Sequence, residues 1–98
     1  MPYAAAKCKQ AAQMPRSIRS DGLLALGRAI AEIRQSRGLS QQQFAISVGC
    51  RQSFIAKVEL GVRRLDVVEL VVLARAMRVE AAELLRRVED ATPTDQRL

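Results

Sequence analysis

A short segment in the middle of the chain, Ser47–Gly61 ("SVGCRQSFIAKVELG"), sets polar side chains against a helical spacing of apolar ones. Ile55 and Val58 point the same way on a helix, and four residues then lie on the other side: Gln52, Ser53, Ala56 and Lys57. A glutamine amide can pair with adenine, a lysine can donate to guanine, and a serine can serve either, while a small alanine leaves room for a thymine methyl. The candidate chemistry is hydrogen bonding to base edges. The alternative is a solvated helix face that contacts nothing.

The residues before and within this segment have the types that a helix-turn-helix requires. Apolar side chains fall where they would fill the wedge between two crossing helices: Phe44, Val48, Cys50, Ile55 and Val58. Ala45 is small where the helices must approach closely, and Gly49 can adopt a positive φ in the turn. The spacing therefore predicts two short helices joined by a tight turn, with the second helix held outward.

Capping patterns and apolar periodicity place the helices that lead to and into this motif. Ser20 or Asp21 caps a first helix whose apolar residues recur every three or four positions up to Gly38. Ser40 and Gln43 have the form of a capping box for a second helix that runs to about residue 48. The third helix covers about residues 51–60 and closes at Gly61.

The segment "LDVVELVVLARAM" is rich in β-branched residues, which is typical of a buried strand. Asp66 and Glu69 form another capping pair, however, and the apolar run exceeds the usual length of a strand, so we expect a helix. A last helix covers roughly residues 81–88. The prediction is an all-α, five-helix domain over residues 21–89, with a flexible basic arm before it (residues 1–20) and a polar tail after it (residues 90–98).

These residues resemble a known family. The pattern from Gln41 to Val58 is similar to the helix-turn-helix of phage repressors and Cro proteins, and the wider stretch "LGRAIAEIRQSRGLSQQQFAISVGC" resembles XRE-type bacterial regulators. The resemblance covers about residues 22–88 and implies a lambda-repressor-like domain. It also implies that the third helix enters the major groove, that the protein binds a two-fold operator as a homodimer, and that Arg34 and Glu59 form an internal ion pair.

The expected contacts fall into two sets. We expect base contacts from the polar face of the third helix, Gln52, Ser53, Ala56 and Lys57. We expect phosphate contacts from Gln41, where the start of a helix offers free N–H groups, and from the arginines around the third helix: Arg51, Arg63 and Arg64. Such phosphate contacts set affinity and salt dependence rather than sequence preference.

Three residues depart from the family pattern. Arg51 stands where a Ser or Thr commonly caps the third helix, so this helix start is either uncapped or served by another group. Arg78 stands where a glycine commonly ends the fourth helix, and Glu80 replaces a usual serine cap before the fifth.

Composition narrows the function further. The 98 residues carry a formal net charge of +6, which favours a polyanion as partner, and no apolar stretch approaches the ~20 residues of a membrane span. The chain has no histidine, and its two cysteines, Cys8 and Cys50, have no metal-ligand spacing, so we expect free thiols, no metal, no cofactor and no enzymatic activity. A cytoplasmic protein is expected.

Sequence-specific binding of double-stranded DNA by a dimeric transcriptional regulator, a repressor or autoregulator, is thus the leading hypothesis. An alternative is an antitoxin or anti-activator that binds a protein partner and for which DNA binding is secondary or absent. Several apolar residues exceed what a small core needs and belong either to the core or to a dimer interface: Leu60, Val62, Leu65, Leu84, Leu85 and Val88.

Overall fold

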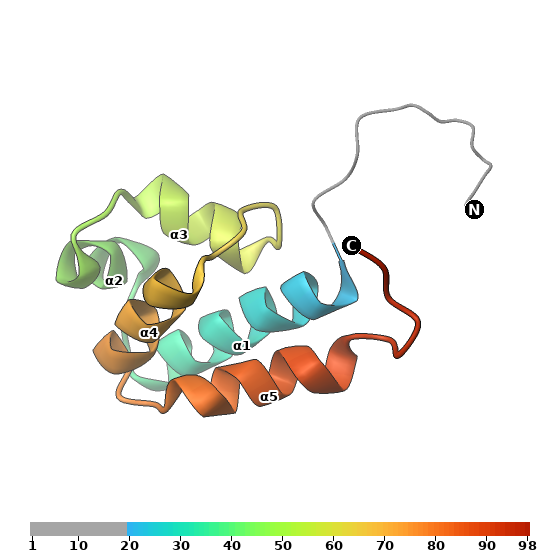
Figure 1. Cartoon of the computed structure of the whole chain (residues 1–98). Coiled ribbons are helices and arrows are strands. Elements are labelled where there is room, and N and C mark those ends of the chain that lie inside the picture. The colour runs from blue at the N-terminus through green and yellow to red at the C-terminus, as the bar shows by residue number, and fades with distance from the viewer. Residues whose placement is uncertain (1–19) are drawn as a thin grey trace.

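Five helices make up the part of the chain that the computed structural model describes, residues 20–98 (Figure 1). They are α1 (Asp21–Ser36), α2 (Gln41–Val48), α3 (Gln52–Glu59), α4 (Val67–Ala76) and α5 (Ala81–Ala91), and residues 20–98 contain no strand. The predicted all-α, five-helix fold is confirmed. The predicted basic arm, with Lys7, Lys9, Arg16 and Arg19, lies outside the described residues, as does Cys8.

Side-chain caps start three of the helices as the sequence predicts. Ser20, not Asp21, caps α1, and its hydroxyl accepts from the backbone N–H of Leu23 at 3.1 Å. Ser40 and Gln43 exchange both bonds of a capping box at α2, at 3.0 and 2.8 Å. Asp66 and Glu69 do the same at α4, at 2.7 and 3.0 Å. This cap holds the valine-rich segment helical despite its β-branched side chains.

The two expected departures at helix starts are visible in the structure. Arg51 at α3 and Glu80 at α5 both stand at the N-cap and make no side-chain capping hydrogen bond. These two helices are therefore held by packing rather than by their caps.

Helix α5 continues to Ala91, three residues past the end that apolar periodicity predicts. The hydroxyl of Thr92 donates to the carbonyl of Val88 at 2.6 Å, and a Cβ on Gly22 would come within 2.5 Å of that hydroxyl. The end of α5 thus packs against the first turn of α1. A contact between residues 70 positions apart leaves no trace in local periodicity.

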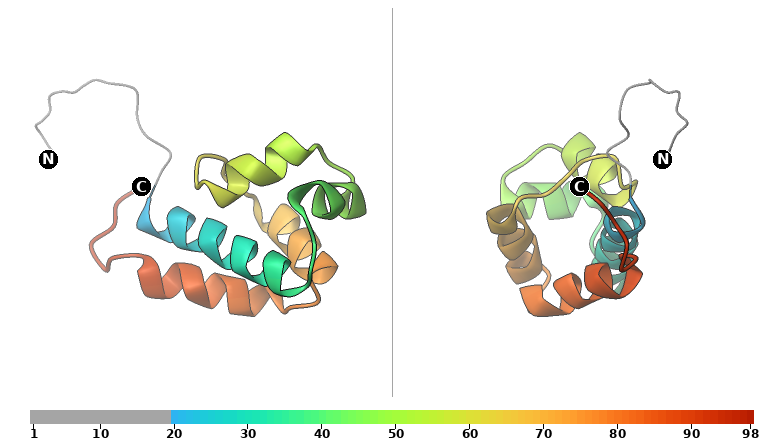
Figure 2. Two further views of the ribbon diagram at one scale, coloured as in Figure 1. Left: turned by 180° about the vertical axis from the view of Figure 1, so that it is seen from behind. Right: turned by 45° about the vertical axis from the view of Figure 1, so that its right-hand side comes forward.

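The core lies where all five helices converge. Its fully buried large side chains are Ile30, Phe44, Ile55, Val58, Met77 and Leu84. Helices α1 and α5 run side by side along one side of the molecule, and α2 and α3 lie across the other (Figures 1 and 2). The sequence predicts that six apolar residues lie either in the core or at a dimer interface. Of these, Leu84 is in the core, Val62, Leu65 and Val88 are half-buried, and Leu60 and Leu85 are exposed.

Gly27 sets the distance between α1 and α3. A Cβ built there would lie 2.6 Å from the carbonyl oxygens of both Val58 and Glu59. Only a residue without a side chain allows this approach, because those neighbours are backbone atoms of a packed helix. Helix α3 is consequently seated directly on α1.

No helix within residues 20–98 is long and apolar enough to cross a membrane.

Arg78 adopts the left-handed conformation that glycine usually supplies at a helix end, with φ of 61°, and its side chain is exposed. Because an L-residue is strained there and glycine is not, we expect Arg78→Gly to stabilise the fold by about 0.5–1 kcal/mol. Urea denaturation followed by circular dichroism measures this. Arg86→Gly, in the middle of α5, is the matched control and should destabilise by about 1 kcal/mol. A loss of stability in Arg78→Gly would contradict the strain argument.

Candidate nucleic-acid interface

The turn between α2 and α3 is built as the sequence pattern predicts. Phe44, Ala45, Ile55 and Val58 are each at most 1% exposed, and Val48 and Cys50 pack against them half-buried. Gly49 has a φ of 80°, which lets the Cys50 N–H turn back to the carbonyl of Ala45 at 3.0 Å. Burial raises the pKa of the Cys50 thiol, in keeping with a packing role. The buried wedge fixes the angle between the two helices.

The opposite side of α3 faces solvent. Gln52, Ser53 and Lys57 are exposed and Ala56 is half-buried, while α3 forms an edge of the molecule (Figure 1). All four predicted base-contact residues thus share one accessible face, which carries no acidic side chain. We refer to Gln52, Ser53, Ala56 and Lys57 as the reading face.

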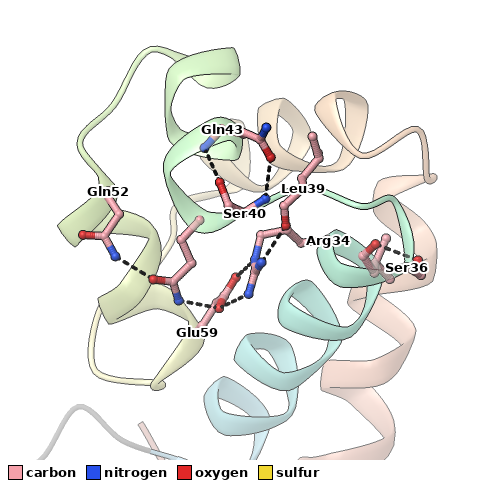
Figure 3. A network of polar contacts seen from close by, with 9 residues as sticks. Arg34, Ser36, Leu39, Ser40, Gln43, Gln52 and Glu59 are labelled. Carbon is pink, nitrogen blue, oxygen red and sulfur yellow. Dashed lines mark hydrogen bonds and ion pairs between the residues drawn. The ribbon is translucent and has the colours of Figure 1, made fainter.

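A buried ion pair lies directly beneath α3. Arg34 of α1 donates from Nε to Glu59 Oε2 at 2.6 Å and from its second terminal nitrogen to Glu59 Oε1 at 3.1 Å (Figure 3). Its remaining terminal nitrogen donates to the carbonyl of Leu39 at 2.7 Å. Both side chains are 8% exposed. This is the ion pair that the family resemblance implies, and it fastens the end of α3 to α1 in a two-bonded geometry.

The ion pair extends to the reading face through two glutamines. Gln41 at the start of α2 donates its amide nitrogen to Glu59 Oε1 at 2.8 Å. Its own oxygen accepts from the amide nitrogen of Gln52 at 2.6 Å (Figure 3). Because an amide carries two donor hydrogens and one acceptor oxygen, Gln52 keeps one hydrogen and its oxygen unused. That remaining pair is the set that adenine N7 and N6 require.

The start of α2 offers backbone donors beside Gln41. Ser40 takes up the N–H of Gln43, so the N–H groups of Gln41 and Gln42 lack a partner within the helix. They point out of the positive end of the helix dipole, which favours an anion.

The three arginines around α3 differ in their surroundings. All three residues are exposed, and only Arg63 among them pairs with an acidic side chain within residues 20–98. Arg63 is engaged within the chain: it lies 3.4 Å from Glu69 and its guanidinium carbon stands 4.8 Å from the centre of the Phe54 ring. Arg51, Lys57 and Arg63 also line an open hollow of about 250 Å³ beside Phe54, so the positive charge gathers along one flank of α3.

Sequence reasoning missed two contacts at this site. The hydrogen bond from Gln41 to Glu59 joins residues of two different helices, and no sequence pattern predicts which side chains of two helices will meet. Phe54 and Arg63 stack, and an aromatic residue near an arginine is too common a pattern to reveal it.

Comparison with known proteins agrees with this geometry. A protein-family model described as "Helix-turn-helix" matches residues 30–84, a range that contains every candidate contact residue. The chain belongs to the XRE family of helix-turn-helix regulators.

Individual proteins are similar to this chain over most of its length. An uncharacterized HTH-type transcriptional regulator, y4dJ of Sinorhizobium fredii, is 32% identical over 71 residues, which are 72% of this chain and 84% of the relative. The restriction-modification controller protein C.AhdI of Aeromonas hydrophila is 35% identical with a TM-score of 0.61, over 63% of this chain and 94% of the other. An XRE-family like protein of Pseudomonas syringae is also 35% identical, with a TM-score of 0.63 over 74% and 88% of the two chains.

Removing one partner of the Arg34–Glu59 pair should be costly. Arg34→Ala leaves a buried carboxylate without its counter-charge, and we expect a loss of about 3 kcal/mol in the free energy of unfolding, measured with urea. The double variant Arg34→Met with Glu59→Leu should regain most of that loss, because it removes both buried charges.

Arg87→Ala serves as the control, since its 3.5 Å pair with Glu32 is exposed and should contribute less than about 1 kcal/mol. If Arg34→Ala and Arg87→Ala lowered the free energy of unfolding equally, the buried pair would contribute no more to stability than the exposed one, which would contradict the prediction.

Proposed function

We propose that this XRE-family regulator binds double-stranded DNA in a sequence-specific way, as a homodimer on a two-fold operator, with α3 in the major groove. The observation that carries the proposal is the exposed reading face, on which Gln52 is already oriented by hydrogen bonds that lead through Gln41 to the buried Arg34–Glu59 pair. In a dimer that reads one side of the duplex, the two copies of α3 lie about 34–36 Å apart, or a multiple of that distance. Occupation of a promoter by such a dimer would repress transcription.

The reading face supplies distinct chemistry at each position. Gln52 offers one donor and one acceptor for adenine, Lys57 donates to guanine oxygen or nitrogen, and Ser53 serves either kind of base. Ala56 is small enough for a thymine methyl to approach. Because Gln41 already holds the Gln52 side chain in place, less side-chain conformational entropy is lost when Gln52 binds a base.

Phosphate contacts flank the reading face in this proposal. Gln41 and the neighbouring backbone N–H groups meet one strand, and Arg51 and Arg64 reach the backbone from the two ends of α3. Arg63 would first have to give up contacts that it makes within the chain, so we assign it a smaller share than Arg64.

The alternative, a module that binds only a protein partner, has less support. The alternating charges of the C-terminal region favoured it, but three charged residues of α5 pair within the chain, and only Glu89 and Asp90 of that helix make no ion pair within residues 20–98. Arg87 lies 3.9 Å from Glu83 and 3.5 Å from Glu32, and Arg86 lies 3.7 Å from Glu83. We also propose that the protein acts by binding rather than by catalysis, and in the cytoplasm, where its DNA would be found.

Two alanine variants test the reading face. Gln52→Ala and Lys57→Ala should each weaken binding to the preferred site by about 1–3 kcal/mol and relax the base preference at one operator position. Fluorescence anisotropy with a footprinted operator and its single-base variants measures both effects. Leu85→Ala, an exposed residue on α5, should change neither. DNA binding with unaltered base preference in both variants would contradict the proposed role of α3.

The phosphate contacts have a different signature. Arg64→Ala should weaken binding about equally for all sequences and reduce the slope of log K against log salt by about 1. Arg86→Ala is the matched control, because α5 lies on the far side of α1 from α3 (Figure 1) and loss of its charge should leave the slope unchanged. Equal slopes for Arg64→Ala and the unaltered protein would remove Arg64 from the interface.

A further inference from the structure

Helix α4 packs apolar residues into the core and exposes further apolar residues, all valines, on the solvent side that also carries Arg75. Leu73, Ala74 and Met77 point into the core and are at most 2% exposed. On the solvent side, Val67 is 77% exposed, Val68 71% and Val72 43%, and Val71 lies half-buried among them on the same side of the helix. We refer to Val67, Val68, Val71 and Val72 as the valine face.

Valine is a poor choice for solvent-facing helix positions. Its branched side chain loses rotamer freedom in a helix, and Ala, Lys or Glu would form the helix more readily. Apart from Glu69 and Arg75, α4 consists of apolar residues, and a helix that is apolar on nearly all sides is normally buried on nearly all sides. The valine face therefore fits a contact that buries it against another apolar surface.

The charges at the two ends of α4 indicate which apolar surface can pack against the valine face. Asp66 is exposed at the start of the helix and Arg75 is exposed near its end. Only one carboxylate oxygen of Asp66 is used, in the cap of Glu69, and Arg75 makes no ion pair within residues 20–98. Two α4 helices packed antiparallel would bring Asp66 of each copy toward Arg75 of the other, whereas parallel packing would set like charges together.

The position of α4 leaves the reading face free. In the right-hand view of Figure 2, α4 lies on one flank of the molecule, beneath α2 and above α5, while α3 lies along the top. Helix α4 packs against α2 and α5, whereas α3 lies on another side of the molecule, so a body docked on this flank leaves α3 accessible. Two molecules joined there can both present α3 on the same side of the pair.

We propose that the valine face is the contact between the two copies of this chain, with the α4 helices antiparallel across the two-fold axis. This inference rests on the proposed function for the dimer and adds the surface that forms it. The four valines form its apolar centre, and a contact of the usual size, about 800 Å² per partner, extends from them over the polar residues at its rim.

Sedimentation velocity over a concentration series, without DNA, tests the contact. Val68→Glu buries two carboxylates at the contact and should shift the unaltered dimer to monomer. Leu85→Glu makes the same change at an apolar residue of α5 that is 57% exposed, and should leave the dimer intact. Circular dichroism shows whether each variant keeps its helices.

A milder variant separates a contact from a solvated face. Val68→Ala with Val72→Ala favours the helix, so on a merely solvated face it would raise or preserve the melting temperature at every protein concentration. At a dimer contact it should instead raise the dissociation constant at least tenfold and lower the melting temperature at low concentration.

Three results would overturn the inference: a monomeric protein with and without operator DNA, dissociation by Leu85→Glu but not by Val68→Glu, or a valine face that binds only a different protein. A dimer that the Val68 variant dissociates, but that has no preference for any DNA, would leave the contact established and would refute the proposed function alone.

Discussion

The buried pair of Arg34 and Glu59 is the constraint on which the rest of this domain depends. Two charged groups that are so far removed from water need hydrogen-bond partners for nearly all of their donors and acceptors. A buried charge without such partners lowers the stability of the fold by several kcal/mol. Arg34 meets this demand with two bonds to Glu59 and one to the carbonyl of Leu39. One guanidinium thereby joins α1, the loop before α2 and the end of α3, and helix arrangements that break these bonds are strongly disfavoured.

The need to satisfy the buried Glu59 carboxylate also orders side chains at the surface. Glu59 has acceptor capacity left after binding Arg34, and Gln41 uses it; Gln41 in turn orients the amide of Gln52. A solvent-exposed glutamine would normally sample many rotamers. Here its orientation follows from a charge pair in the interior, so the surface proposed to meet DNA is organised before DNA arrives.

The interior of this domain is closely packed, whereas one helix leaves apolar side chains exposed to solvent. Gly27 lets the backbone of α3 rest on α1, and the interior formed around Phe44 and Met77 is closed to solvent. Helix α4 completes that interior with one face and leaves valines exposed on the other. The core of the monomer therefore buries one side of α4, and the proposed dimer buries the other.

The sequence alone determined the features that depend on neighbours three or four residues apart. The caps at Ser40 and Asp66 and the inward spacing of Ile55 and Val58 follow from local hydrogen bonds and helical periodicity. The pairing of Arg34 with Glu59 came from family resemblance rather than from spacing. Only the tertiary structure decided the link from Gln41 to Glu59, the stacking of Arg63 on Phe54, the extension of α5 to Ala91 and the exposure of the valine face. Each of these depends on how helices distant in sequence are placed against one another, and local patterning does not encode that placement.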